Sequence, residues 1–285
     1  MSSEQTTNLI APEPPELALE VQDALRTKSE LPVAKMTMLG ILAGAYIAFG
    51  GLFALVALGG ANDLPHGVGQ ILAGGVFTLG LVLVVIAGAE LFTGNTLMTG
   101  LAVTGSLSWG SLLRAWSIVY VANLVGSLLI AALALAGNVH TAGEGAVGRA
   151  ALEIADSKAG LSWRAAFFSG ILANMLVCLA VWMAYSGRTT TDKIIAVFLP
   201  IAAFVAAGLE HSVANMYLIP YGWSVKTFAD PQFWEASGVS AGAFPSISLV
   251  GFLSNLVPVT LGNITGGSLI AVAYAFAYPQ KKTAG

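Results

Sequence analysis

The sequence predicts an all-α integral membrane protein with six transmembrane helices in two inverted three-helix repeats. The chain of 285 residues is 56% hydrophobic and only 9% charged, whereas soluble domains have about 25% charged residues. Its charge-free stretches are also long enough to cross a bilayer. A third observation, a pair of related motifs in the two halves of the chain, predicts the repeat.

Six charge-free stretches define the expected spans, because about 20 apolar residues cross the hydrocarbon core as a helix. The last stretch includes a loop, and the fifth continues beyond Glu210 and His211. The stretches are 36–61, 67–89, 115–139, 165–187, 194–209 and 236–280. The division expected for the chain is an N-terminal tail, 1–35, a transmembrane domain, 36–279, and a C-terminal tail, 280–285.

The acidic N-terminal tail lacks the apolar core of a signal peptide and predicts an amphipathic helix from about Pro15 to Ser29. If six spans alternate, eight of the twelve Lys and Arg residues fall on the side of the termini. The other four are Arg149, Lys158, Arg164 and Lys226. The positive-inside rule then places both termini in the cytoplasm.

Two motifs in the chain share their glycine, glutamate and asparagine at a constant offset of 120: Gly88-Ala-Glu-Leu-Phe-Thr-Gly-Asn95 and Gly208-Leu-Glu-His-Ser-Val-Ala-Asn215. Asn123-Leu-Val-Gly also pairs with Asn255-Leu-Val-Pro at an offset of 132. With three spans in each half, the second half is inverted relative to the first. We therefore expect breaks in the second and fifth helices that meet near the midplane, where unpaired backbone N–H groups can line a cavity.

His211 is the candidate for proton chemistry, because an imidazole inside a membrane span is costly and changes charge near physiological pH. A buried histidine with a purely structural hydrogen bond is the alternative, and the neighbouring Glu210 favours a functional role. Glu90 and Glu210 occupy matching positions and are expected to hold the unwound backbone, although a direct place in a permeation path stays open. His211 has no histidine counterpart in the first half.

Other candidates each have a structural and a functional interpretation. Lys158 ends a stretch, 148–158, that predicts a short surface helix; it either concentrates anions at a pore mouth or is solvated beside Asp156. Asparagines in apolar stretches are expected mainly to tie helices together; they are Asn95, Asn123, Asn174, Asn215, Asn255 and Asn263. Bulky side chains near the breaks either pack the core or form dry constrictions; they are Phe77, Leu81, Leu91, Phe92 and Phe204.

No motif in the sequence predicts an enzyme. The sequence has no G-x-x-x-x-G-K-[ST], no H-E-x-x-H and no second histidine within ligand reach of His211 along the chain, so neither a cofactor nor a metal is expected. It also has no basic patch with interleaved aromatic residues for nucleic acid. Cys178 is the only cysteine and lies within a predicted span, where a small buried hydrophobe is expected.

At these residues the chain resembles the formate/nitrite transporter family. The resemblance extends from about Leu31 to Pro279 and involves both halves. The segments that carry it are "GAELFTGNTLM" (88–98), "GILANMLVCLAVWMAYSGR" (170–188), "GLEHSVANM" (208–216) and "NLVPVTLGNITGG" (255–267). It implies an aquaporin-like fold in the bacterial inner membrane and a homopentamer with one pore in each protomer.

The resemblance also implies roles for individual residues. His211 is expected to be the central pore histidine, and Thr93, on an omega-shaped loop, its hydrogen-bonding partner. Leu81 and Leu91 would form the cytoplasmic constriction. Phe77 and Phe204 would form the periplasmic one. The expected polar positions around the pore are Lys158, Asn174, Glu210 and Asn263.

The function implied by the resemblance is transport of formate, and a titratable His211 between apolar rings favours coupling of this transport to a proton. Nitrite, hydrosulfide and lactate are the other anions expected in this family. We expect a neutral acid to cross during uptake at acidic pH, and an anion to be released toward a neutral cytoplasm. Two other classes stay open: an aquaporin-type facilitator for neutral solutes, and a membrane anchor for a dehydrogenase, for which the chain offers little docking surface.

Overall fold

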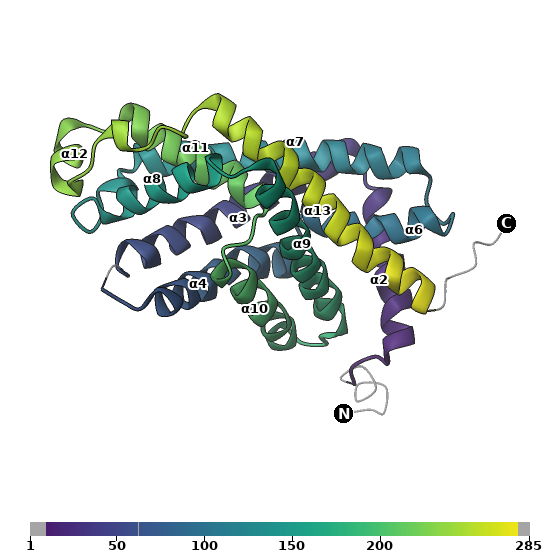
Figure 1. Cartoon of the computed structure of the whole chain (residues 1–285). Coiled ribbons are helices and arrows are strands. Elements are labelled where there is room, and N and C mark those ends of the chain that lie inside the picture. The colour runs from purple at the N-terminus through teal and green to yellow at the C-terminus, as the bar shows by residue number, and fades with distance from the viewer. Residues whose placement is uncertain (1–9, 62, 279–285) are drawn as a thin grey trace.

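The computed structural model describes residues 10–61 and 63–278, and every regular element among them is a helix (Figure 1). The predicted C-terminal tail, 280–285, lies outside the described residues. Five helices are long and apolar enough to cross a membrane. They are α3 (Val33–Gly59), α4 (His66–Ala87), α7 (Trp109–Ala136), α9 (Trp163–Ser186) and α13 (Leu249–Ala277).

The second and fifth predicted spans are interrupted, as the paired motifs predict. After α4 the chain leaves the helix at Gly88 and resumes in three short helices: α5 (Phe92–Asn95), η1 (Thr96–Met98) and α6 (Thr99–Val103). The fifth span is divided into α10 (Thr190–Ala206) and α11 (Ser212–Phe228). Each of these two helices has 17 residues, which is the lower limit for a transmembrane helix, and neither is among the five spanning helices, so the count of six spans stays a prediction.

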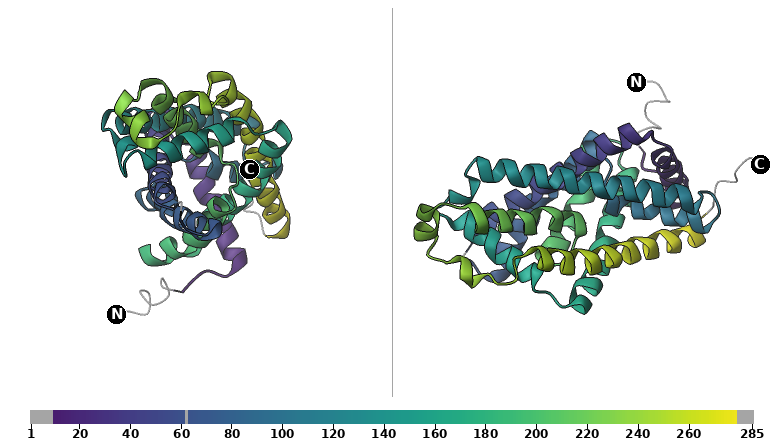
Figure 2. Two further views of the ribbon diagram at one scale, coloured as in Figure 1. Left: turned by 60° about the vertical axis from the view of Figure 1, so that its left-hand side comes forward. Right: turned by 90° about the horizontal axis from the view of Figure 1, so that it is seen from above.

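The two halves of the chain have the same architecture. In the first half α3 packs against α4 and α7, and in the second half α9 packs against α10 and α13. α7 and α13 run along opposite sides of the molecule (Figure 2, right). Glycines let α7 approach α3 closely, and α13 approach α9. A Cβ at Gly126 of α7 would overlap the carbonyl of Ile41 in α3, and one at Gly266 of α13 would overlap the carbonyl of Ile171 in α9.

The repeat also includes an amphipathic helix that precedes each set of spans. α2 (Pro14–Ser29) lies before α3, as predicted, and α8 (Ala146–Ala159) lies before α9. The sequence Gly-Ile-Leu-Ala occurs at 40–43 in α3 and again at 170–173 in α9, an offset of 130. The same offset relates Lys28 near the end of α2 to Lys158 near the end of α8.

α8 differs from the short surface helix predicted over 148–158. It is longer, and one side of it is buried, with Val147, Ala151, Leu152 and Ala155 inside the protein. It packs mainly against α11 and also against α3. α8 is thus part of the packed core, and the alternative of a solvated Lys158 is wrong, because this side chain is only 15% exposed.

The second sequence pairing, Asn123 with Asn255, is also wrong. Asn123 contacts the first break through Phe92 and Glu90, and the residue with the same contacts at the second break is Asn263. The correct offset is 140, which aligns "NLVGSLLIA" (123–131) with "NITGGSLIA" (263–271). The shared Asn-Leu-Val at 255 misled the prediction because three common residues are a weak signal in such an apolar chain.

Candidate functional site

Each helix break begins at a glycine in the left-handed conformation. Gly88 has φ +79° and Gly208 has φ +66°. A Cβ at either position would meet no atom within 4 Å, so the requirement is for the backbone conformation rather than for space. The N–H groups that follow, of Ala89 and Leu209, turn back to the carbonyls of Val84 and Phe204, which closes the preceding helix in both halves.

One asparagine side chain satisfies the unwound backbone at each break. Asn123 accepts the Phe92 N–H at 2.9 Å and donates to the carbonyls of Gly40 and Glu90. Asn263 accepts the Ser212 N–H at 2.8 Å and donates to the carbonyls of Gly170 and Glu210. The amide thereby pairs polar groups that lipid or a dry core cannot satisfy.

A glutamate in each break is held by asparagine amides and a lysine. Glu90 accepts from the Asn95 amide at 2.9 Å and lies 3.0 Å from Lys28 Nζ. Glu210 accepts from the amides of Asn215 and Asn255, at 2.7 and 3.0 Å, and lies 2.6 Å from Lys158 Nζ. Both carboxylates are buried, which is tolerable because each is paired and hydrogen-bonded.

His211 caps α11 and joins the two breaks. Its Nδ1 accepts the N–H of Ala214 at 3.1 Å, and its Nε2 lies 2.8 Å from the Thr93 hydroxyl oxygen. An Nδ1 that accepts a hydrogen bond carries no proton, so in the neutral ring the hydrogen sits on Nε2 and is donated to Thr93. The Thr93 hydroxyl then has its own hydrogen free to donate.

The turn that carries Thr93 is braced from α9. The Asn174 amide donates to the carbonyl of Asn263 at 2.6 Å, to the Thr96 hydroxyl at 3.0 Å and to the Thr93 carbonyl at 3.3 Å. Its buried Oδ1 has no partner among the described residues. Asn174 therefore fixes the Thr93 backbone, and it lines none of the cavities described next.

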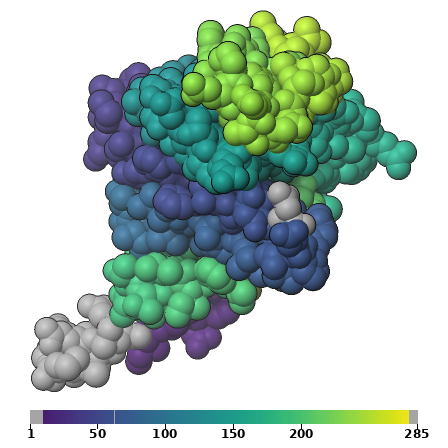
Figure 3. Space-filling view, turned by 90° about the vertical axis from the view of Figure 1, so that its left-hand side faces the viewer, coloured from purple at the N-terminus to yellow at the C-terminus, as the bar shows by residue number. Residues whose placement is uncertain are grey.

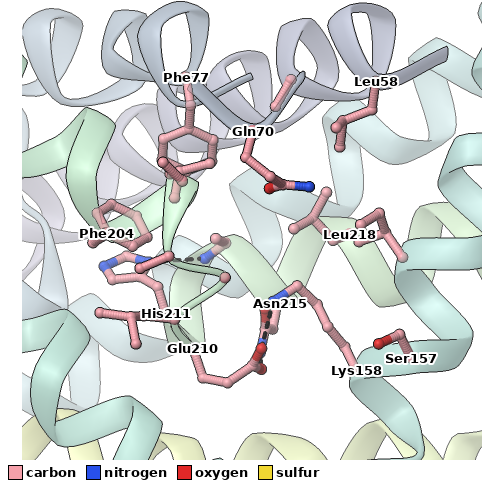
Figure 4. A pocket seen from close by; sticks show the side chains of 18 of the residues that line it. Leu58, Gln70, Phe77, Ser157, Lys158, Phe204, Glu210, His211, Asn215 and Leu218 are labelled. Carbon is pink, nitrogen blue, oxygen red and sulfur yellow. Dashed lines mark hydrogen bonds and ion pairs between the residues drawn. The ribbon is translucent and has the colours of Figure 1, made fainter. Parts of the chain in front are cut away.

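Two cavities approach His211 from opposite ends of the molecule. The first, of about 270 Å³, opens at the end that carries α12 (Pro231–Ser237), and Lys158, Glu210 and His211 line it (Figure 4). Figure 3 looks onto this end. The second, of about 220 Å³, lies at the end that carries α2, with Lys28 and Glu90 in its wall. We call these the α12 cavity and the α2 cavity.

A narrow apolar zone separates the two cavities. It encloses about 10 Å³, which is about the room needed by one water. The rings of Phe77 and Phe204 meet edge to face with centroids 5.5 Å apart, and Phe204 lies 5.7 Å from the His211 ring. Leu81 and Leu91 line the same zone, and Leu91 also borders the α2 cavity. The lining is thus continuous from one end of the protomer to the other, with His211 at its narrowest part.

The comparisons with known proteins agree with this geometry. The family model described as "Formate/nitrite transporter" matches residues 15–278. The chain is 40% identical over 258 residues to "Formate channel FocA" of Escherichia coli (strain K12), with 90% of each chain covered. It is 40% identical over 270 residues to "Probable formate transporter" of Methanothermobacter thermautotrophicus, with 88% of this chain and 91% of the relative covered.

A solved structure, "Pentameric formate channel with formate bound", is 39% identical and superposes with a TM-score of 0.83, covering 86% of this chain and 96% of that chain. The chain belongs to the formate/nitrite transporter family. As a family member with several apolar helices of spanning length, it is a multi-pass membrane protein.

In this formate/nitrite transporter most of the predicted site residues come together. Thr93, Glu210 and His211 gather at the junction of the breaks, with Asn174 and Asn263 as braces. Phe92 does not join them. Its ring packs edge to face against Trp116 and Tyr120, with centroids 6.0 and 4.8 Å away, and borders none of the cavities described above. The alternative that Phe92 forms a constriction is therefore wrong. Leu91 has extended backbone and Phe92 is the first residue of α5, so the two adjacent side chains leave the turn in different directions.

Lys28 is the residue of the transporter that sequence reasoning missed. Burial opposes its charged form, yet the Glu90 carboxylate more than compensates and raises the pKa of the ammonium group. The sequence does contain a signal for it, since the repeated Gly-Ile-Leu-Ala aligns Lys28 with Lys158 at the same offset of 130. It was overlooked because α2 was treated as part of a tail.

Proposed function

We propose that the chain forms a pore for formate through each protomer of a homopentamer. The support is twofold. The relatives named above are a formate channel, a probable formate transporter and a pentameric formate channel. Within a single protomer, a narrow apolar zone lined by His211 separates two cavities from opposite ends. The His211–Thr93 contact at 2.8 Å, between those cavities, is the observation that carries the proposal.

The donors at the narrow zone suit a small monovalent anion. His211 lines this zone, and the buried Thr93 lies behind it as its hydrogen-bonding partner. Because neutral His211 directs its Nε2 hydrogen at Thr93, we infer that the Thr93 hydroxyl hydrogen becomes available to a carboxylate or nitrite oxygen that reaches the His211 ring. The apolar rings around it exclude water and would strip an anion of its hydration shell, at a cost of several kcal/mol. A permeant that accepts hydrogen bonds and can take up a proton suits this zone better than a sugar or an amino acid does.

Proton coupling through His211 is part of the proposal. A proton added to the ring must go to Nδ1, which then gives up its hydrogen bond from the Ala214 N–H. Losing such a helix cap costs about 1 kcal/mol, and burying the charged ring costs more. A formate anion beside the ring offsets this cost, since each charge favours the other. We therefore infer that formate crosses the zone as the neutral acid during uptake at acidic pH, and that His211 receives or supplies the proton.

The remaining parts of the proposal concern topology. The charge distribution favours cytoplasmic termini in a bacterial inner membrane, so the α2 cavity would face the cytoplasm and the α12 cavity the other side. The transmembrane domain is proposed to extend over 36–279, between an N-terminal segment, 1–35, whose helix α2 docks on the first break, and a short C-terminal tail. The pore is proposed to carry its substrate without catalysing a reaction on it.

The experiment is competitive flux through purified protein in liposomes. Labelled formate uptake is measured alone and in the presence of nitrite, lactate or hydrosulfide, and against empty liposomes. We expect uptake of formate above the empty control, with competition strongest from the anions that share its size. Water or glycerol flux without formate uptake would support the neutral-solute facilitator instead. Strong uptake of nitrite with no formate uptake would reassign the substrate within the family.

A further inference from the structure

The two cavities contain the same set of charges, with one difference. Each has a lysine whose ammonium group is paired with a break glutamate, Lys28 with Glu90 and Lys158 with Glu210. Each also has a second basic side chain, which comes from the first turn of the helix that precedes the other break. In the α2 cavity this is Lys193 of α10, and in the α12 cavity it is His66 of α4.

His66 and Gln70 lie one turn apart on the face of α4 that leads to the narrow zone. Both line the α12 cavity, and Phe77 and Leu81 follow on the same helix at the zone itself. Gln70 extends its amide into the cavity between Phe77 and Leu58 (Figure 4). A permeant entering from the α12 end therefore passes a basic group and an amide before it reaches the aromatic rings.

The other cations near His66 are each paired with a carboxylate. On α8, Arg149 is paired with Glu153 at 2.8 Å, and both line a polar groove of about 390 Å³ that also contains His66 and Gln70. Lys158 is paired with Glu210, and Asp63 lies in the exposed connection before α4. Within residues 10–61 and 63–278, neither the His66 nor the Gln70 side chain has a hydrogen bond or ion pair within the protein. His66 is thus the basic group of this cavity that is free to bind an incoming anion.

We propose that His66, with the Gln70 amide, forms an outer binding site for a small carboxylate or oxyanion at the α12 end, and that acid on that side strengthens the site. The inference rests on the proposed transport of such an anion and names its point of capture. A histidine side chain gains charge as the pH falls from about 8 to about 5, whereas a lysine keeps its charge over this range. The α12 cavity therefore captures anions preferentially at acidic pH, while the α2 cavity, with Lys193, binds them about equally across this range.

The test compares KM for formate entering from the α12 side in liposomes of known protein orientation, at about pH 5.5 and about pH 7.5. At the acidic pH we expect KM to rise about two- to fivefold in His66→Ala, the effect of one partly solvated charge. At the neutral pH the two proteins differ little. His66→Lys matches the wild type in acid and has the lower KM at neutral pH. Each comparison is made at one pH, so the fraction of neutral formic acid is the same for both proteins.

Arg164→Ala is the matched control, because it removes an exposed cation from the same end of the molecule but outside the α12 cavity and the polar groove. Its KM stays at the wild-type value. Salt at about 0.5 M reduces the His66 effect, since it screens the interaction, and Gln70→Ala raises KM at both pH values. An equal KM for His66→Ala and wild type in acid contradicts the inference.

A binding measurement keeps the test independent of transport. Ligand binding to the folded state raises the melting temperature, so formate raises it more for wild type than for His66→Ala at the acidic pH. Wild-type protein that binds formate in this way but does not carry it defeats the proposed function and supports the outer site. Flux with no difference in KM or melting shift between the two proteins defeats the outer site alone.

Discussion

The ammonium groups of Lys28 and Lys158 occupy equivalent positions in the two halves, 3.0 and 2.6 Å from the carboxylates of Glu90 and Glu210. Because Lys28 belongs to α2, the helix before the first span is a component of the repeat rather than an appendage. Each half thus consists of an amphipathic helix, two long uninterrupted helices and one segment divided by a break, and the amphipathic helix supplies the lysine that pairs with the break glutamate.

Removing Lys28 or Lys158 leaves a buried carboxylate unpaired, but the expected loss in the free energy of unfolding differs between the two. The Lys158 side chain is 15% exposed and that of Lys28 is 28% exposed, so we expect a loss in stability of ~3 kcal/mol for Lys158→Ala and ~1 kcal/mol for Lys28→Ala. Thermal unfolding in detergent measures both. Lys158→Met combined with Glu210→Gln recovers much of the loss, because no charge is then left unpaired. Equal destabilisation by the double and the single variant would contradict the ion-pair account.

Substitution of the break glycines, Gly88 and Gly208, tests whether their backbone conformation or the space around them requires glycine. Gly88→Ala and Gly208→Ala each place a Cβ in open space but at positive φ, so each destabilises the fold by about 1 kcal/mol through the backbone alone. Gly67→Ala is the control. It also meets no atom within 4 Å, but it lies in the first turn of α4 and is expected to be neutral or stabilising. A destabilisation by Gly67→Ala as large as that at the breaks would show that space, not φ, decides.

We expect water to leak through the narrow apolar zone when the edge-to-face contact between Phe77 and Phe204 is removed. Phe77→Ala or Phe204→Ala widens the apolar zone beyond the room for one water. We expect at least a severalfold rise in osmotic water permeability, measured by light scattering of liposomes. Phe168→Ala, a change of the same size on a ring that is 57% exposed, leaves the permeability unchanged. An unchanged permeability in the first two variants would show that another feature closes the pore.

The sequence predicts the fold class and the positions of the breaks because both follow from strong local rules. Charge-free stretches of spanning length require helices, and the motifs at 88–95 and 208–215 share residue types that are costly in a membrane. The correct residue pairing between the third helix and the sixth could be found only from the hydrogen bonds in the structure. Asn123 and Asn263 are equivalent because each binds a break, and neighbouring sequence alone favoured Asn255.

Side-chain direction and helix docking were the other limits of prediction. Leu91 and Phe92 are adjacent apolar residues near the break, yet Leu91 lines the narrow zone and Phe92 packs against α7. The backbone dihedral angles that decide this are not encoded by hydrophobic periodicity. The sequence also left two alternatives for Lys158, and only the docking of α8 shows that it is paired with Glu210.

The central claim is that His211 carries the proton that accompanies formate, and one measurement tests it most directly. Initial rates of formate uptake into liposomes are recorded from about pH 5 to about pH 8 for wild type, His211→Phe and Thr93→Val. We predict that the rate of the wild type rises steeply with acidity, that His211→Phe loses this dependence, and that Thr93→Val retains it at a lower rate. The same pH dependence in His211→Phe as in the wild type would contradict the account.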